Sequence, residues 1–373
     1  MVAATLFYNA AQLVLDGLLL AYLARRPGWP RALAVGVAAG AGAIPLAVAA
    51  LVLFRLGLFG LIQLAAWGLF LHGPLLLAGC WLLCRGRRPR LARLAAACAA
   101  ALLLVAAHAF LIEPRWLEVS HVRIETERLG RPLRIAVVAD LQTDAVGAHE
   151  RRALESALAS EPDLIVLPGD FLQIPARDKE RMARERGRLR SLLDELGFQA
   201  PLGVYAVGGN TDSPGWESLF EGLPVTVFPR SGSVELDELS LTALDVTDSF
   251  RRDLVIPRGE RFHLVLGHGP DYALGDRVEA DLLIAGHCHG GQVRLPFLGP
   301  PIKLSRVPRR LTSGAHEIRS GTWLVVSRGV GMERAQAPRL RFLCRPEVVV
   351  IDLVPYSGAP ADPLRSRAAV ERE

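Results

Sequence analysis

The amino-acid sequence predicts an α/β domain that is preceded by an α-helical transmembrane domain. Two observations support this: the first third of the chain contains long apolar stretches, and from Trp116 onward short β-branched runs alternate with charged, helix-like stretches. With 51% hydrophobic and 22% charged residues, the chain of 373 residues is too apolar to be disordered, and its first third is too apolar to be soluble. We therefore expect a transmembrane domain at 1–113, an α/β domain at 114–355 and a disordered tail at 356–373.

Four apolar stretches are each long enough to cross a bilayer, which takes about 20 residues. They lie at residues 2–23, 32–54, 59–83 and 91–112. The first stretch lacks the basic start and the small-residue cleavage site of a signal peptide. The sequence therefore predicts an integral, multi-pass protein of the plasma (inner) membrane with about four spans.

Basic residues gather beside these apolar stretches. Residues 1–113 contain nine arginines and two acidic residues, whereas the rest of the chain contains 34 basic and 36 acidic residues. The high pI of 9.2 therefore reflects loop arginines and not a nucleic-acid-binding surface. The first and third loops hold more arginine than the second, which predicts that these two loops are cytoplasmic and that the α/β domain lies outside. Loss of one span would reverse this orientation, and the third span is the weakest because it contains His72-Gly73-Pro74.

The first apolar stretch also contains polar residues. Asn9, Gln12 and Asp16 recur there at helical spacing. An ionisable residue within a membrane span is a functional candidate, and a transporter or sensor function would depend on Asp16 alone. Since no partner for Asp16 is apparent mid-span, we interpret it as a residue near the membrane interface or one satisfied by a neighbouring helix.

The α/β domain is predicted from short apolar runs and charged stretches between them. Strands are expected at 134–139, 163–167, 204–207, 263–266, 282–285, 323–326 and 348–353, and helices at 147–160 and 177–196. Strands alternate with helices early in this domain and follow one another later. This order predicts mixed sheets packed face to face.

Polar side chains follow five of these strands, mostly beside glycine. They are Asp140, Asp170, Asn210, His268, His287 and His289. Ligands of α/β sheets collect beyond the carboxyl ends of strands, and glycine lets the backbone turn sharply there. A single Asp or Asn after a strand is commonly a turn residue, but two histidines ringed by glycine have no common packing role.

The types of these side chains point to metal binding. Carboxylate and amide oxygens bind hard divalent cations, and imidazole suits Mn, Fe, Zn or Ni. Two such ions about 3.5–4 Å apart can share a carboxylate and a hydroxide and stabilise an in-line displacement at phosphorus. The sequence therefore predicts a binuclear metal site.

Five motifs carry a family resemblance in a fixed order. They are Asp140-Leu-Gln142, Gly169-Asp170, Gly209-Asn210-Thr211-Asp212, Gly267-His268 and Gly286-His287-Cys-His289-Gly-Gly-Gln292. The series resembles the calcineurin-like metallophosphoesterase superfamily over residues 113–353. It is most similar to the bacterial membrane-anchored branch in its lead-in IEPRWLEVSHVRIE, its block GHCHGGQVRLP and its ending RLRFLCRPEVVVIDL. The resemblance implies a four-layer α/β/β/α metallophosphoesterase sandwich and a metal-dependent hydrolase with two divalent ions, Mn favoured and Mg, Fe or Zn as alternatives.

The resemblance also implies a role for each ligand. Asp170 would bridge the two metals, and Asp140 and His289 would complete the first site. The second site would have three further ligands: Asn210, His268 and His287. A hydroxide between the metals would be the nucleophile, with Asp170, Asn210 and His268 as the catalytic residues around it.

Gln142 departs from the family pattern, which usually has histidine there. A glutamine oxygen is a neutral, harder and weaker donor than imidazole, so we expect weaker binding at the first site and a shift toward Mn or Mg over Zn. Gln142 remains a predicted metal ligand. Glutamine at this position also resembles a branch that hydrolyses nucleotide diphosphate linkages.

Thr211 is the second departure, because the family usually has a histidine there that helps to protonate the leaving oxygen. Threonine cannot act as a general acid near neutral pH, so leaving groups that need no proton should be favoured. Four other side chains are conceivable substitutes, although we interpret them as surface residues: Asp144, His149, His263 and His316.

These observations favour a membrane-embedded phosphohydrolase that cleaves a phosphodiester or diphosphate bond of an amphiphilic, lipid-linked substrate. UDP-diacylglucosamine is one candidate, but it is made on the cytoplasmic side, in conflict with the predicted orientation. The alternative is a degenerate, non-catalytic binding or scaffold protein. Retention of Asp170 and all three later histidines argues against this alternative, since no structural role requires those ligands together.

Overall fold

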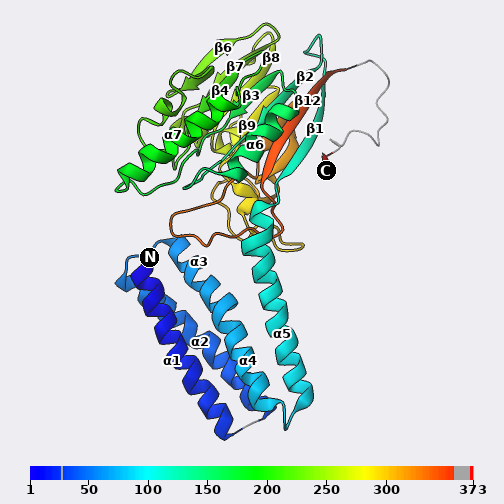
Figure 1. Ribbon diagram of the computed structural model, residues 1–373. Coiled ribbons are helices and arrows are strands. Elements are labelled where there is room, and N and C mark those ends of the chain that lie inside the picture. The colour runs from blue at the N-terminus through cyan, green and yellow to red at the C-terminus, as the bar shows by residue number, and fades with distance from the viewer. Residues whose placement is uncertain (27, 357–369, 373) are drawn as a thin grey trace. The chain divides into compact units, whose positions relative to one another are not determined.

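The computed structural model describes residues 1–26, 28–356 and 370–372 (Figure 1). The chain divides into two compact units, one formed by residues 1–112 with 333–339 and the other by residues 113–332 with those from 340 onward. Most of the expected tail at 356–373 lies outside the described residues. Within that tail, Val370–Arg372 form the short strand β13.

The first unit is helical. Its helices are α1 (Val2–Arg25), α2 (Trp29–Leu53), α3 (Leu58–Trp67), α4 (Gly73–Cys84) and α5 (Pro89–Ala107), with π-helical turns at Gly68–His72 and His108–Ile112. The first π-helical turn joins α3 to α4, so the predicted third span is one continuous helical segment. By length and composition, four segments are able to span a membrane: Val2–Arg25, Trp29–Leu53, Leu58–Cys84 and Pro89–Arg115. These helices agree with the four predicted apolar stretches and are compatible with membrane anchoring.

Small residues lie between these helices, while large apolar side chains point outward. Many of the buried residues of the first unit are alanines, and the exposed ones include Leu18, Ile44 and Leu104. A β-carbon on Gly79 would lie 2.5 Å from the Leu20 side chain, and one on Gly68 would lie 2.7 Å from the Tyr8 hydroxyl. Close helix approach at small residues, with an apolar exterior, is the packing typical of helices in lipid.

A polar cluster is buried inside this helical unit. His72 Nδ1 lies 2.7 Å from Asp16 Oδ2, and His72 Nε2 lies 2.9 Å from Asn9 Oδ1. Gln12 donates a hydrogen bond of 2.9 Å to the other oxygen of Asp16. The interpretation that a neighbouring helix satisfies Asp16 is therefore confirmed, and its partner is the histidine that ends the first π-helical turn.

We expect His72→Ala to destabilise the helical unit by about 1–3 kcal/mol, because it leaves the buried Asp16 carboxyl without its imidazole partner. The measurement is thermal unfolding of the full chain in detergent, with Leu103→Ala on the exposed side of α5 as the control. The pair Asp16→Asn with His72→Ala should cost less than the sum of the two single changes. Additive effects would contradict a direct interaction between these two side chains.

The second unit contains two mixed sheets. The order in the seven-stranded sheet is β13, β1 (Glu118–Thr126), β12 (Glu347–Pro355), β2 (Leu133–Val137), β3 (Leu164–Leu167), β4 (Val204–Val207) and β5 (Val225–Phe228). The order in the six-stranded sheet is β10 (Gly314–Arg319), β11 (Thr322–Val326), β9 (Leu282–Ala285), β8 (Phe262–Leu266), β7 (Leu239–Ala243) and β6 (Gly232–Glu235). Strands β2 to β5 are parallel, as are β7, β8, β9 and β11.

The two sheets pack face to face around one apolar core. Ile135 and Val166 of the first sheet share a buried cluster with Leu264 and Ile284 of the second. The alternate residues of β2 and β3 point the other way, toward α6 (Ala148–Ala159) and α7 (Lys179–Glu195), which cover the outer face of the first sheet (Figure 1). The predicted α/β fold with mixed sheets is confirmed. The outer face of the second sheet is covered by short elements, α8 (Val246–Ser249) and the 3₁₀ turn Pro270–Leu274, together with loops.

Candidate metal centre

The predicted ligands all lie just beyond the carboxyl ends of parallel strands. Asp140, Asp170 and Asn210 each come three residues after a strand of the first sheet, namely β2, β3 and β4. His268 and His287 each come two residues after a strand of the second sheet, β8 and β9. Because β2, β3 and β4 are parallel to one another, as are β8 and β9, these loops meet at one end of the sandwich.

The backbone at this edge is strained. Asp140, Gln142, Asp170, His287 and His289 all have positive φ angles, between 32° and 64°. A non-glycine residue seldom adopts this conformation, and such residues collect at functional sites where the surrounding structure holds them. The strain therefore marks the same loops that the motifs do.

Glycine lets the loops approach each other. A β-carbon on Gly209 would lie 2.2 Å from Asp170 Oδ1, and one on Gly286 would lie 2.7 Å from Asp140 Oδ2. Any larger residue at either position would push a carboxylate out of place. These two glycines allow ligands from different strands to converge.

The structure brings the carboxylate and imidazole ligands together in two groups. In each group, the donor atoms lie within 4.8 Å of one another. One group consists of Asp170, His268 and His287, and the other of Asp140, Asp170 and His289. Asp170 belongs to both, as expected of a bridging ligand.

Asn210 and Gln142 lie beside these groups. Asn210 Oδ1 is 2.9 Å from His268 Nε2. The Gln142 backbone N–H donates to the Asp170 carbonyl at 2.8 Å, and its side-chain amide donates to Gln173 Oε1 at 3.1 Å. Gln142 is therefore attached to the loop of the bridging carboxylate, and its role as a metal ligand stays a prediction.

The donor atoms around His268 fit a divalent cation. His268 Nδ1 lies 2.7 Å from the Pro168 carbonyl, so this nitrogen carries the proton and donates. In the neutral ring, Nε2 then carries a lone pair. This nitrogen lies 2.9 Å from Asn210 Oδ1 and 3.5 Å from Asp170 Oδ2. Three acceptors that face one another are stabilised when a cation lies among them.

The other two imidazoles are also held by hydrogen bonds. His287 Nε2 lies 3.2 Å from the Leu304 carbonyl, which leaves Nδ1 as the ligand atom. The Phe250 ring packs edge-on against the His287 ring at 4.8 Å between centroids. His289 Nδ1 lies 3.5 Å from a guanidinium nitrogen of Arg341, which is fully buried.

Burial keeps the imidazoles neutral, as metal binding requires, and it makes the carboxylates costly to ionise. Desolvation lowers the pKa values of His268 and His287 to about 4, so both imidazoles are neutral ligands at physiological pH. Desolvation, and then the charge of Asp170, raises the pKa of Asp140 well above its usual range, and desolvation also raises the pKa of Asp170. Divalent cations bound here would stabilise the ionised forms of these two buried carboxylates.

Two functional residues had no role assigned from the sequence. Asp212 accepts hydrogen bonds of 2.8 Å from the backbone N–H groups of Gly209, Asp170 and Phe171, and thereby fixes the two ligand loops to each other. Burial, and then the charge of Asp170, raises the pKa of Asp212 to about 7. The second residue is Arg341, described above. Both lie within quoted motifs, but their spacing carries no sign of their contacts.

Each of the four side chains considered as a substitute acid has a partner in the structure. Asp144 pairs with Arg181 at 3.0 Å, His149 with the Val330 carbonyl at 3.0 Å, His263 with Thr242 at 2.9 Å and His316 with the Ser313 carbonyl at 2.9 Å. The interpretation of Asp144 and His263 as surface residues is wrong, since both are buried. His263 lies near the start of β8, roughly 16 Å along the chain from His268, because a strand rises about 3.3 Å per residue.

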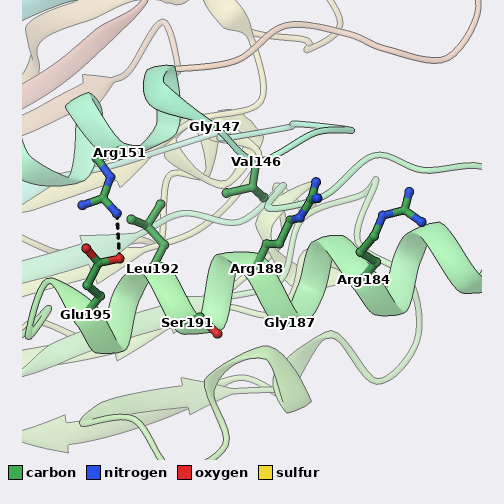
Figure 2. Close-up of a pocket in the computed structure, with 9 residues that line it drawn as sticks. All are labelled: Val146, Gly147, Arg151, Arg184, Gly187, Arg188, Ser191, Leu192 and Glu195. Carbon is green, nitrogen blue, oxygen red and sulfur yellow. Dashed lines mark hydrogen bonds and ion pairs between the residues drawn. The ribbon is translucent and has the colours of Figure 1, made fainter.

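A surface pocket between α7 and the loop before α6 is separate from this centre (Figure 2). Its arginines already have carboxylate partners: Arg151 pairs with Glu195 at 2.7 Å, while Arg184 and Arg188 share Glu185 at 3.2 and 3.0 Å. None of the residues that line the pocket is a predicted metal ligand. This pocket is therefore not part of the candidate metal centre.

Comparison with known proteins agrees with this geometry. Residues 133–291, which begin with β2 and end just after His289, match the family of calcineurin-like phosphoesterases. The metallophosphoesterase YkuE of Bacillus subtilis is 33% identical over 212 residues, which cover 52% of this chain and 68% of YkuE. The chain belongs to the calcineurin-like phosphoesterase family. The matched residues of this phosphoesterase include all six predicted strand-end ligands, and family membership supports a metal-dependent hydrolase.

Other relatives have related names. Phosphodiesterase YaeI of Escherichia coli is 28% identical over 269 residues, 65% of this phosphoesterase and 90% of YaeI. A metallophosphoesterase of Aquifex aeolicus is 27% identical over 260 residues, with coverages of 65% and 94%. The solved structure of the E. coli phosphoesterase YfcE aligns with a TM-score of 0.30 and 16% identity over 56% of this chain and 85% of YfcE.

We expect the purified phosphoesterase to bind about two equivalents of Mn²⁺ and Asp170→Asn to lose most of both, because Asp170 contributes to both ligand groups. His289→Ala should lose only the first ion. Elemental analysis after dialysis measures both outcomes, with His316→Ala on the outer strand β10 as the control. Two retained ions in Asp170→Asn would contradict the bridging role.

Gln142→His should raise the affinity of the first site for Mn²⁺ by about tenfold, because imidazole is the stronger donor. Titration calorimetry of the full chain measures this change. Gln173→His, at the hydrogen-bond partner of Gln142, is the control and should leave the affinity unchanged. An unchanged affinity in Gln142→His would remove this residue from the ligand set.

Proposed function

We propose that this protein is a two-metal phosphodiesterase or diphosphatase that acts at a membrane on an amphiphilic, lipid-linked phosphate. One observation carries the proposal: two groups of buried ligand atoms share Asp170 at the meeting edge of two sheets. The family of the chain supports the reaction class. The lipid-linked substrate is inferred from the apolar helices that the same chain contains.

The residues of the chain would hold the reacting groups in place. When bound, two divalent ions would activate a water molecule and neutralise charge on the phosphate. Asp170 is oriented beforehand, since its Oδ1 accepts a hydrogen bond of 2.8 Å from the Thr211 backbone and its own N–H is held by Asp212. His268 is fixed by the Pro168 carbonyl. Such preorganised groups need no rearrangement as charge develops at phosphorus.

Attachment to a bilayer favours a lipid substrate. The catalytic unit starts at Glu113, directly after the helical turn that ends at Ile112, so no linker separates it from the last apolar segment. A hydrolase held in this way has ready access to phosphate groups at the lipid surface.

The leaving group is inferred from Thr211. The structure provides the Thr211 backbone N–H to Asp170, and a threonine hydroxyl is too weak an acid to protonate an alkoxide. A phosphate or nucleotide that leaves from a diphosphate needs no proton, so a diphosphate substrate such as UDP-diacylglucosamine agrees with this residue. That substrate requires a cytoplasmic catalytic unit, whereas the arginine distribution favours the opposite side.

A non-catalytic scaffold is the competing function. It would need no buried carboxylate pair and no strained ligand loops. The positive φ angles of Asp140, Asp170 and His287 cost stability, and such residues collect at functional sites. These angles favour the enzyme.

We expect the full chain in detergent to hydrolyse bis-p-nitrophenyl phosphate with stimulation by Mn²⁺, and EDTA to abolish this activity. Asp170→Ala should reduce turnover by about 100-fold or more, because loss of a metal ligand costs more than the 10–100-fold typical of a supporting residue. His316→Ala should keep the wild-type rate. Equal rates with EDTA, or in Asp170→Ala, would rule out the two-metal mechanism.

Thr211→His should accelerate hydrolysis of alkyl phosphodiesters more than that of p-nitrophenyl phosphodiesters, because only the poor leaving group needs a proton. An increase of about tenfold or more is expected for the alkyl substrate. The ratio of the two kcat/KM values is the measurement. Equal acceleration of both substrates would contradict the leaving-group argument.

A further inference from the structure

An exposed apolar hairpin follows the metal-binding histidines. Leu295 and Gly299 close it with two backbone hydrogen bonds of 2.9 Å each. Phe297 at its tip is fully exposed, and Leu295 and Leu298 are exposed beside it. We call residues 295–299 the apolar hairpin. Large apolar side chains held outward by a closed turn mark a surface that another apolar phase covers.

The base of the apolar hairpin is joined to the start of the catalytic unit. The Arg294 N–H donates to the Phe342 carbonyl at 2.8 Å. The next residue, Leu343, donates its N–H to the Glu113 carboxylate at 2.9 Å. Glu113 is the residue with which the catalytic unit begins, directly after Ile112. Each of these few residues spans only a few ångströms, so the distance from Arg294 to the junction between Ile112 and Glu113 is at most about 25 Å.

The segment around the apolar hairpin is positively charged. Residues 290–313 contain five basic side chains and no acidic ones. The basic residues are Arg294, Lys303, Arg306, Arg309 and Arg310. An apolar tip with a basic surround is the combination that binds anionic lipid surfaces, since the tip enters the acyl boundary and the cations meet the headgroups.

The same segment supports the metal centre. The Leu304 carbonyl, in the chain that returns from the apolar hairpin, lies 3.2 Å from His287 Nε2. Ser305 and Arg306 both donate to the Asp271 carboxylate, at 2.6 and 2.7 Å, and fix this return segment to the 3₁₀ turn that follows β8. A surface that binds the hairpin would therefore lie near the ligands.

We infer that the apolar hairpin inserts into the surface of an anionic lipid bilayer and presents the metal centre to phosphates at that surface. The purpose that we assign to the insertion rests on the proposed function, whereas the insertion itself can be tested without it. The bilayer is favoured over a second copy of the chain for two reasons. The hairpin base is joined through Phe342 and Leu343 to Glu113, which follows the apolar helices, and the segment 290–313 that contains the hairpin has only basic charged residues.

Spin labelling tests the insertion without any activity measurement. The full chain, with Cys98→Ser to remove the exposed cysteine, is labelled at Phe297→Cys and reconstituted into nanodiscs that contain phosphatidylglycerol. Val255→Cys, at an exposed apolar residue of the same unit, is the matched control. We expect the label at 297 to be more accessible to oxygen than to a water-soluble nickel complex, and the label at 255 to show the reverse.

Two outcomes would overturn the inference. One is equal access of the nickel complex to both labels, which would leave the apolar hairpin in water. The other is dipolar broadening between labels at 297 in nanodiscs that hold two copies, which would make a second copy the occupant. Because neither readout uses catalysis, they remain decisive if the proposed activity is absent.

A kinetic arm connects the apolar hairpin to the proposed function. Phe297→Ser with Leu298→Ser should raise the KM for a phosphodiester presented in anionic vesicles by about tenfold, which corresponds to about 1.4 kcal/mol of lost binding. The kcat/KM for soluble bis-p-nitrophenyl phosphate should stay within about twofold. An equal loss on both substrates would show damage to the metal centre instead and would contradict the hairpin's role in lipid access.

Discussion

The structure depends on an electrostatic constraint: two carboxylates are buried at the edge where two sheets meet, and the imidazoles beside them are neutral. Burial raises the cost of ionising both Asp140 and Asp170, and the charge of Asp170 raises that of Asp140 further. The fold meets that cost in part with backbone N–H groups, since His287 donates to both oxygens of Asp140 at 3.0 Å. Divalent cations would supply the remaining positive charge, so the same arrangement explains the glycines, the strained φ angles and the family chemistry.

The ligand loops could be predicted from sequence because each signal is local. An apolar run such as Leu164–Leu167, followed within three residues by an aspartate, predicts a side chain just beyond the carboxyl end of a strand. Parallel strands bring several such ends together. Strands with one partly exposed face were harder to predict. β6 alternates between half-buried and exposed positions, and β10 is half-buried at all positions but one. β1 pairs with β12, which lies more than 200 residues further along the chain.

Contacts between distant segments could not be predicted. His72 contacts Asp16, which lies 56 residues earlier in the chain. The direction of the His72 side chain depends on the π-helical turn that ends at His72. Arg341 is an ordinary arginine in the sequence, yet it is buried against His289 and donates to the backbone carbonyls of Arg328 and Cys344. The exposure of Phe297 is equally invisible in a sequence, since apolar residues are normally expected inside. These features come from packing geometry, which no local pattern records.

The direct junction between Ile112 and Glu113 has a consequence for how such an enzyme would meet its substrate. A catalytic unit without a linker cannot drift into bulk water, so its encounters would be governed by lateral diffusion of lipids. Its rate would then follow the mole fraction of substrate in the membrane and not the total amount in the cell. Dilution of the substrate with inert lipid should slow such an enzyme, whereas dilution of the whole suspension with buffer should not.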